Sequence, residues 1–315
     1  MPAVQQYLQK RGQNLQAWSG NREQGFNRLH QQIAPGIEQF QQNREAMWNQ
    51  LRGLGTDRFR MARERGADWQ NYRQNLWRFR YERAGEIRNW VRSGFDDLFT
   101  YDWWGRHHGH IFPLGDYSPW WWWNGCAWDN LVSFGDFGWV TPIYYDYDAN
   151  VVVDDDVYID GQDWGPRTAY AQQAIQLANP PVVVDQPTPP QSAGEQDEWQ
   201  PFGVFALTQE EKGDATMFFQ LAVSKGGLIG GAFTNILTGD SAAVAGSIDR
   251  TTQRAAWHVG DKSDTVYETG AANLTLDVAP VLIHFGTQVT QTWLLVRLPS
   301  PDLPTAPVPE NITPQ

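Results

Sequence analysis

Apolar residues in the first hundred positions of the chain recur every eleven residues. The repeat appears as two parallel series, the second displaced by three positions: Val4, Leu15, Phe26, Ile37, Trp48 and Phe59, and Tyr7, Trp18, Leu29, Phe40, Leu51 and Ala62. Eleven residues make close to three helical turns, so these positions lie along one nearly straight stripe. We therefore predict that residues 1–100 form an Arg/Gln/Asn-rich, coiled-coil-like helical arm. Its stripe would pack on its own copies or on the rest of the chain.

After Phe59 the stripe slips by one position and continues through Trp69, Tyr72, Leu76, Arg83, Ile87 and Trp90. An arginine on the stripe can lay its aliphatic stem along the seam and stack its guanidinium on a neighbouring tryptophan. Pro35-Gly36 and Gly53-Leu-Gly55 mark kinks or turns. One kinked helix and a helical hairpin both fit this pattern.

The pattern changes from Trp199, where short runs alternate between apolar and polar residues. Seven or eight strands are predicted, and the candidate runs are 202–207, 217–225, 228–237, 242–249, 254–259, 265–269, 281–285 and 292–298. Their spacing of about ten residues predicts a small antiparallel β-barrel or sandwich over residues 199–299. A Pro-rich acidic linker at 180–198 precedes this domain, and a Pro-rich tail at 300–315 follows it.

The middle of the chain, residues 101–179, is rich in Trp, Tyr and Asp. Nine of the 17 tryptophans fall between Trp103 and Trp164, and four are consecutive: Trp120, Trp121, Trp122 and Trp123. Such a run suits a compact, irregular aromatic cluster or a self-association surface. Exposed indoles could instead stack on a glycan or an apolar ligand, which makes these four the candidate binding residues. Further along, we predict a hairpin over 144–160 that turns at 154–156, and a short helix over 168–177.

Charge divides the chain into a basic arm and an acidic remainder. Residues 1–100 carry 16 Lys or Arg against 10 Asp or Glu, whereas residues 101–200 carry 2 against 15. This asymmetry favours a homo-oligomer or an anionic envelope polymer as the partner of the arm. A net of +6 over a hundred residues is weak for nucleic acid. The sequence contains no run of 18 apolar residues, so no transmembrane helix is predicted. Its first residues lack the apolar core of a secretory signal.

Candidate chemistry is sparse. His107, His108 and His110 form the one metal-like cluster, although two or three imidazoles need further ligands in fixed geometry to make a site. A surface turn is the favoured interpretation of this cluster, and no cofactor is expected. His258 and His284 stand singly in predicted strands, and no Ser or Cys has a base partner in the sequence. We therefore do not expect an enzyme.

Several stretches resemble a family of planctomycete secreted or cell-surface proteins that are often labelled mu-protocadherin-like. The resemblance is carried by Pro142–Tyr147, Tyr170–Ala174, Phe202–Leu207, Leu221–Lys225, Thr252–Trp257, Glu268–Gly270, Asn273–Thr275 and Trp293–Leu298. It covers most of the chain and is strongest from 140 to 298. It implies a location in the cell envelope or outside the cell, and no described activity. The cadherin part of the label does not transfer, because the acidic segments show no repeated calcium-ligand pattern.

These observations give two hypotheses, both favoured over a third, a metal-dependent enzyme that uses His107, His108 and His110. The first is a non-enzymatic structural or interaction protein of the bacterial cell envelope or surface, self-associating through its helical arm. The second is a ligand-binding module that holds a glycan or an apolar ligand on the β domain or on the Trp cluster.

Overall fold

The computed structural model describes residues 67–95, 98–100, 103, 119–135, 137–148, 151–153, 155–180, 199–210 and 213–300. The predictions for residues 1–66, for the linker at 181–198 and for the tail at 301–315 lie outside these ranges. So do His107, His108 and His110. All described residues belong to one compact unit of the chain.

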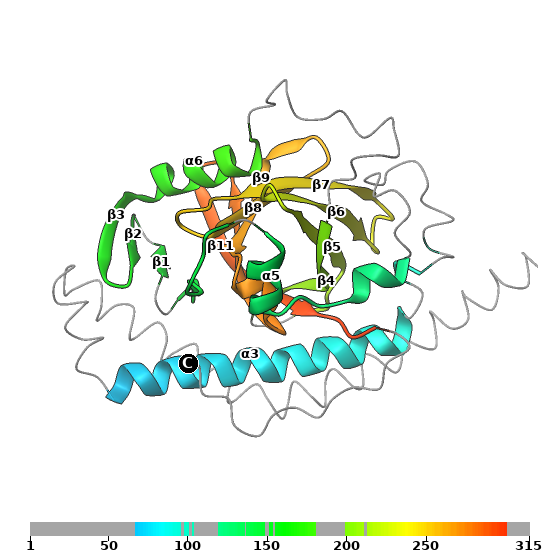
Figure 1. The fold of residues 1–315 in the computed structure, drawn as a ribbon. Coiled ribbons are helices and arrows are strands. Elements are labelled where there is room, and N and C mark those ends of the chain that lie inside the picture. Colours follow the sequence, from blue (N-terminus) through cyan, green and yellow to red (C-terminus); the bar gives the residue numbers. More distant parts are fainter. Residues whose placement is uncertain are drawn as a thin grey trace, which may run out of the picture. The chain divides into compact units, whose positions relative to one another are not determined.

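A closed, eight-stranded antiparallel barrel forms the centre of this unit (Figure 1). Its strands are β4 (Trp199–Gln209), β5 (Met217–Ser224), β6 (Leu228–Asn235), β7 (Ser241–Ile248), β8 (Arg254–Val259), β9 (Lys262–Gly270), β10 (Val278–Phe285) and β11 (Val289–Arg297). Each strand pairs with the next along the chain, and β11 returns to pair with β4. The predicted barrel is confirmed, and closure removes the sandwich alternative along with the exposed edges that a sandwich would leave.

Alternation along the strands sorts side chains to the two faces of the barrel wall. In β5, Phe219, Leu221 and Val223 point inward, whereas Phe218 and Ala222 point outward and are also fully buried. Both faces of this strand are therefore covered. This explains why β5 reads as an almost continuous apolar run.

Aromatic rings fill the barrel interior. Phe219 lies 5.2 Å from Phe233, 6.0 Å from Trp257 and 5.1 Å from Tyr267, measured between ring centroids. Helix α5 (Trp128–Phe134) and the residues after it pack against one end of this core. There the Trp139 indole donates a hydrogen bond of 2.7 Å to the carbonyl of Arg250.

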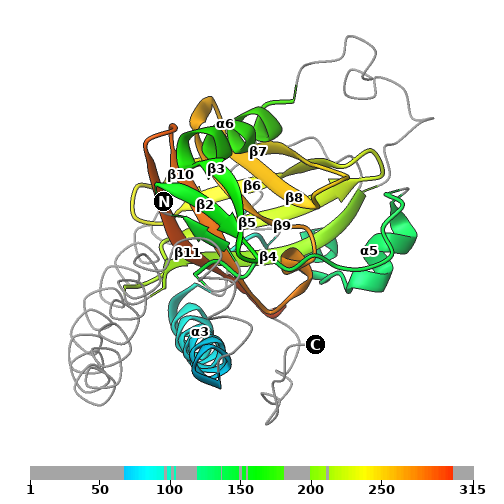
Figure 2. The ribbon, with the colours of Figure 1, turned by 90° about the vertical axis from the view of Figure 1, so that its left-hand side faces the viewer.

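Three groups of elements cover the outside of the barrel (Figures 1 and 2). Helix α3 (Ala67–Gly94) contacts β10 and β11, and helix α6 (Arg167–Ala178) contacts β7, β8 and β9. The short 3-10 helix η1 (Pro119–Trp123) lies on β4 and β5. A small antiparallel sheet of β1 (Val151–Val153), β2 (Asp156–Ile159) and β3 (Gln162–Pro166) leads into α6.

The described part of the arm is helical, and its stripe faces the barrel. Leu76, Ala84 and Ile87 are buried on α3, and the predicted stripe residue Arg83 is buried with them. The sequence left open whether the stripe packs on its own copies or on the rest of the chain. For the described residues of α3, the structure shows packing on the rest of the chain.

Candidate functional site

The predicted tryptophan run forms η1 on the outer wall of the barrel. Trp122 is buried, and Trp121 and Trp123 are half-buried against Val204, Phe218 and other residues of β4–β6. Trp120 belongs to the same helix. The structure thus places Trp121, Trp122 and Trp123 against the barrel wall.

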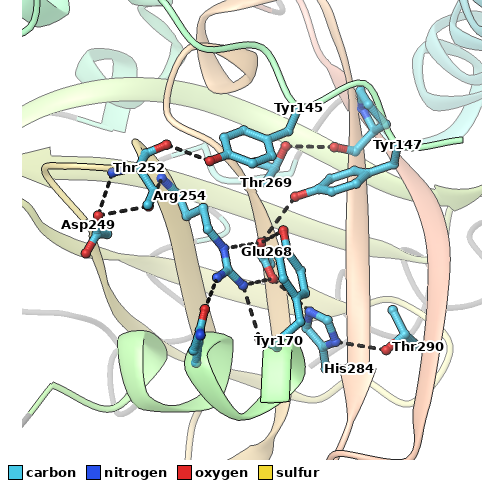
Figure 3. Close-up of polar contacts among 12 residues, drawn as sticks. Tyr145, Tyr147, Tyr170, Asp249, Thr252, Arg254, Glu268, Thr269, His284 and Thr290 are labelled. Atoms are coloured by element: carbon cyan, nitrogen blue, oxygen red, sulfur yellow. Dashed lines mark hydrogen bonds and ion pairs between the residues drawn. The ribbon is translucent and has the colours of Figure 1, made fainter. Parts of the chain in front are cut away.

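A second cluster lies on the outer wall beneath α6 and was not predicted. Glu268 of β9 stands between Ala256 of β8 and Leu282 of β10 in the strand register, and its side chain points out of the barrel. Helix α6 and residues 145–147 cover it, so Glu268 is fully buried (Figure 3). A buried carboxylate of this kind requires partners, because desolvation of a charge is costly.

Glu268 has four such partners. Arg254 donates through Nε at 2.7 Å to one carboxylate oxygen and through Nη2 at 2.9 Å to the other. His284 Nε2 lies 2.8 Å from Oε2, and the hydroxyls of Tyr170 and Tyr147 donate to Oε1 at 2.8 and 3.4 Å (Figure 3). The two-point contact with Arg254 is the strong, planar form of an arginine–carboxylate pair.

Electrostatics keep this cluster charged. Burial alone would raise the pKa of Glu268, but Arg254 and the hydrogen bond from His284 lower that pKa to about 2. Burial likewise opposes the charge on Arg254, whereas Glu268 raises the pKa of the guanidinium above its ordinary value. Burial and the nearby carboxylate raise the pKa values of Tyr147 and Tyr170 well above the ordinary value, so both phenols stay protonated.

A third cluster joins α3 to the rest of the unit. Arg80 is fully buried and donates to Glu210 at 2.6 Å, to Asp146 at 2.7 Å and to the carbonyl of Tyr147 at 2.7 Å. Asp146 also accepts from Arg73 at 2.9 Å and from the indole of Trp77 at 3.0 Å. Burial would lower the pKa of Arg80, but Glu210 and Asp146 raise it above its ordinary value.

Tyr147 connects the two arginine clusters. Its carbonyl accepts from Arg80, and its hydroxyl donates to Glu268 on the barrel wall. The single residue thus joins α3, the segment before β1 and strand β9. In the sequence Tyr147 lies 67 residues from Arg80 and 121 residues from Glu268.

The contacts of the Glu268 cluster suit a role in holding elements together better than a role in proton transfer. His284 bridges Glu268 and Thr290, whose Oγ1 lies 2.9 Å from Nδ1, so carboxylate, imidazole and hydroxyl occur in series. In a hydrolytic triad the carboxylate stabilises an imidazolium as it forms. Here the charge of Glu268 is already matched by Arg254. Burial also raises the pKa of the Cys126 thiol to about 11, which keeps this side chain protonated at neutral pH.

Sequence reasoning missed Arg80, Arg254 and Glu268. For Arg254 and Glu268 the signal was weak, because each is a charged residue in a predicted strand but β9 also holds Lys262, Asp264 and other polar residues. Arg80 carried none that separated it from the other arginines of the arm. Both charged strand residues also lie in the stretches that carry the family resemblance, Thr252–Trp257 and Glu268–Gly270.

Comparisons with family models, with curated proteins and with solved structures give no match to this chain. Within the described ranges, no three His, Cys, Asp or Glu side chains are grouped in a way that could hold a metal ion. None of the described helices combines the length and the apolar character needed to span a bilayer.

Proposed function

We propose that this chain is a non-enzymatic structural or interaction protein of the bacterial cell envelope or surface, which self-associates through its helical arm and carries the β-barrel as a fixed head. The observation that carries the proposal is the Arg80 cluster. Through Arg80, the last part of the arm is bound to Glu210 at the end of β4 and to Asp146 in the segment before β1.

A buried ionic cluster is a poor way to gain stability, because apolar packing of the same volume is often at least as stabilising. It is better suited to fixing one arrangement. Three donors of Arg80 reach three different acceptors, which sets the rotation of α3 about its own axis. In this proposal the preceding stripe, Val4 to Ala62, is the part of the arm that meets its copies.

The buried polar groups of the barrel wall support the non-enzymatic part of the proposal, because they pair with one another. The charges of Arg254 and Glu268 satisfy each other, and the hydroxyls of Tyr147 and Tyr170 donate to the same carboxylate. The location in the envelope or outside the cell rests on the family resemblance.

Substitutions on the stripe test the proposal. Leu29→Glu combined with Phe40→Glu places two charges on the stripe, whereas Gln31→Glu combined with Gln42→Glu places two charges on the opposite side of the repeat. Sedimentation equilibrium should show that the first variant loses the native oligomer and that the second keeps it. An identical mass for the native chain and both variants would contradict the proposal.

A second candidate function is a ligand-binding module for a glycan or an apolar ligand. The barrel interior is filled by its own rings, which disfavours that location. The outer wall under the tryptophan run is favoured by a specific observation, a buried amide without a partner at Gln220.

A further inference from the structure

Gln220 lies in the middle of β5 and points out of the barrel. Its neighbours across the strands are Val204 of β4 and Ala232 of β6. The side chain is completely buried, and neither its amide nitrogen nor its amide oxygen has a hydrogen-bond partner. A buried donor and acceptor that are left unpaired cost folding free energy.

The surroundings of Gln220 are apolar and aromatic. Val204, Ala232, Phe218 and Ala222 surround it on the wall and belong to one cluster with Trp122, against which Trp121 and Trp123 pack. The indole nitrogen of Trp123 is also buried without a hydrogen-bond partner. An aromatic cluster with a few unpaired polar groups has the composition of a small-molecule site.

Another buried glutamine has hydrogen-bond partners for both the nitrogen and the oxygen of its amide. Gln253 donates through Nε2 to the carbonyl of Thr141 at 2.9 Å and accepts from the backbone N–H of Ile143 at 2.8 Å. Its exposed fraction is 4%, close to the 0% of Gln220. Burial of a glutamine therefore does not force its amide to stay unpaired in this protein. The free-energy cost of the unpaired amide at Gln220 is therefore not explained by the stability of the fold alone.

We propose that the apolar outer wall at Gln220 binds a small uncharged molecule that presents a hydrogen-bond acceptor and donor side by side on an apolar body. A carboxamide, a lactam or the edge of a nucleobase has this character. Its polar edge pairs with both atoms of the Gln220 amide, and its flat body packs among the indoles. Trp123 Nε1 offers a further donor. An uncharged ligand fits because the residues that flank Gln220 on the wall are apolar, and an ion would lose its hydration there.

This inference rests on the second candidate function and is independent of self-association. Since Gln220 is fully covered, the side chains that cover it must move for the molecule to enter, and tryptophans belong to the cluster around it. Binding is therefore expected to change tryptophan fluorescence and to be slow relative to diffusion.

Two matched substitutions in the full chain test the proposal. Gln220→Met removes an unpaired amide, so the melting temperature should rise by about 3 °C. Gln253→Met removes a paired amide at the same level of burial, so the melting temperature should fall. If Gln220→Met lowers the melting temperature, a partner already satisfies the amide, and the proposal is overturned.

Ligand binding is measured by calorimetry with three probes that each carry a single benzene ring: benzamide, toluene and benzoate. The native chain should bind benzamide about tenfold more tightly than toluene or benzoate, and Gln220→Met should lose that preference. Gln253→Met should keep the preference. Equal affinity of the native chain for benzamide and toluene, or no binding of benzamide, would overturn the proposal. Neither result would affect the sedimentation test of self-association, so the two proposals can fail separately.

Discussion

At the scale of single residues, the context of Glu268 decides its behaviour. The same carboxylate would be nearly neutral if it were buried alone, because water solvates the charge far better than the barrel wall does. Arg254 and His284 reverse this outcome and hold the pKa at about 2. The cluster therefore depends above all on the pair of Glu268 and Arg254, because removal of either charge leaves the other buried without it.

Glu268→Gln should be strongly destabilising for this reason. It leaves the Arg254 guanidinium, with an exposed fraction of 4%, beside an uncharged amide. The free energy of unfolding should fall by about 3–5 kcal/mol, as measured by urea denaturation. Glu82→Gln on the exposed side of α3 is the control and should change it by less than about 0.5 kcal/mol. Equal effects of the two substitutions would show that Glu268 does not hold the wall together.

The pKa of Glu268 also predicts a pH dependence. A carboxylate whose folded pKa lies below its unfolded value binds fewer protons in the folded state, so its contribution is complete above the unfolded pKa of 4.5. As the pH falls from about 5 to 2, about 3 kcal/mol of stability should be lost from this group alone.

The measurement compares the native chain with Glu268→Gln across this pH range. Because the variant lacks the titrating group, its free energy of unfolding should fall less steeply than that of the native chain. Parallel curves would mean that Glu268 has an ordinary pKa in the folded protein.

At the scale of elements, the strands were predictable because their pattern is local. All eight barrel strands were expected, and their observed bounds differ by a few residues from the predicted ones. The hairpin over 144–160 corresponds to β1 and β2, but β3 was missed. Its sequence, Gln162-Asp-Trp-Gly-Pro166, does not alternate and ends in proline, so only pairing with β2 identifies it as a strand.

The candidate site could not be predicted in the same way. Arg254 and Glu268 meet because β8 and β9 pair in one register, and a shift of one residue would place the two side chains on opposite faces. Tyr147 and Tyr170 reach the cluster from elements whose position depends on the whole fold. Gln220 was equally hidden, because the apolar and aromatic cluster around it comes from other strands and from η1.

The attachment of α3 gives a prediction for this element. Arg80→Met leaves Asp146 and Glu210, with exposed fractions of 0% and 4%, without the guanidinium that neutralises them. Hydrogen exchange should then become faster in the amides of residues 67–94 than in the barrel strands, because the helix loses its anchor.

Arg78→Met is the control for this measurement, because Arg78 is exposed and contacts only its neighbour Asn75 among the described hydrogen bonds. It should leave the exchange rates of α3 unchanged. If Arg80→Met also leaves them unchanged, apolar contacts alone hold the helix.

At the scale of the whole molecule, the chain combines a basic stripe-bearing arm with an acidic head. The buried Arg80 of α3 connects this helix, through Tyr147, to the Glu268 cluster on the barrel wall.

Light scattering coupled to size exclusion tests self-association most directly, on the full chain and on a chain that begins at Arg60. The shortened chain keeps every described element, so its barrel should fold, with α3 in place. We expect a defined oligomer for the full chain and a folded monomer for the shortened one. A monomeric full chain, or the same oligomer for both, would contradict assembly through the arm.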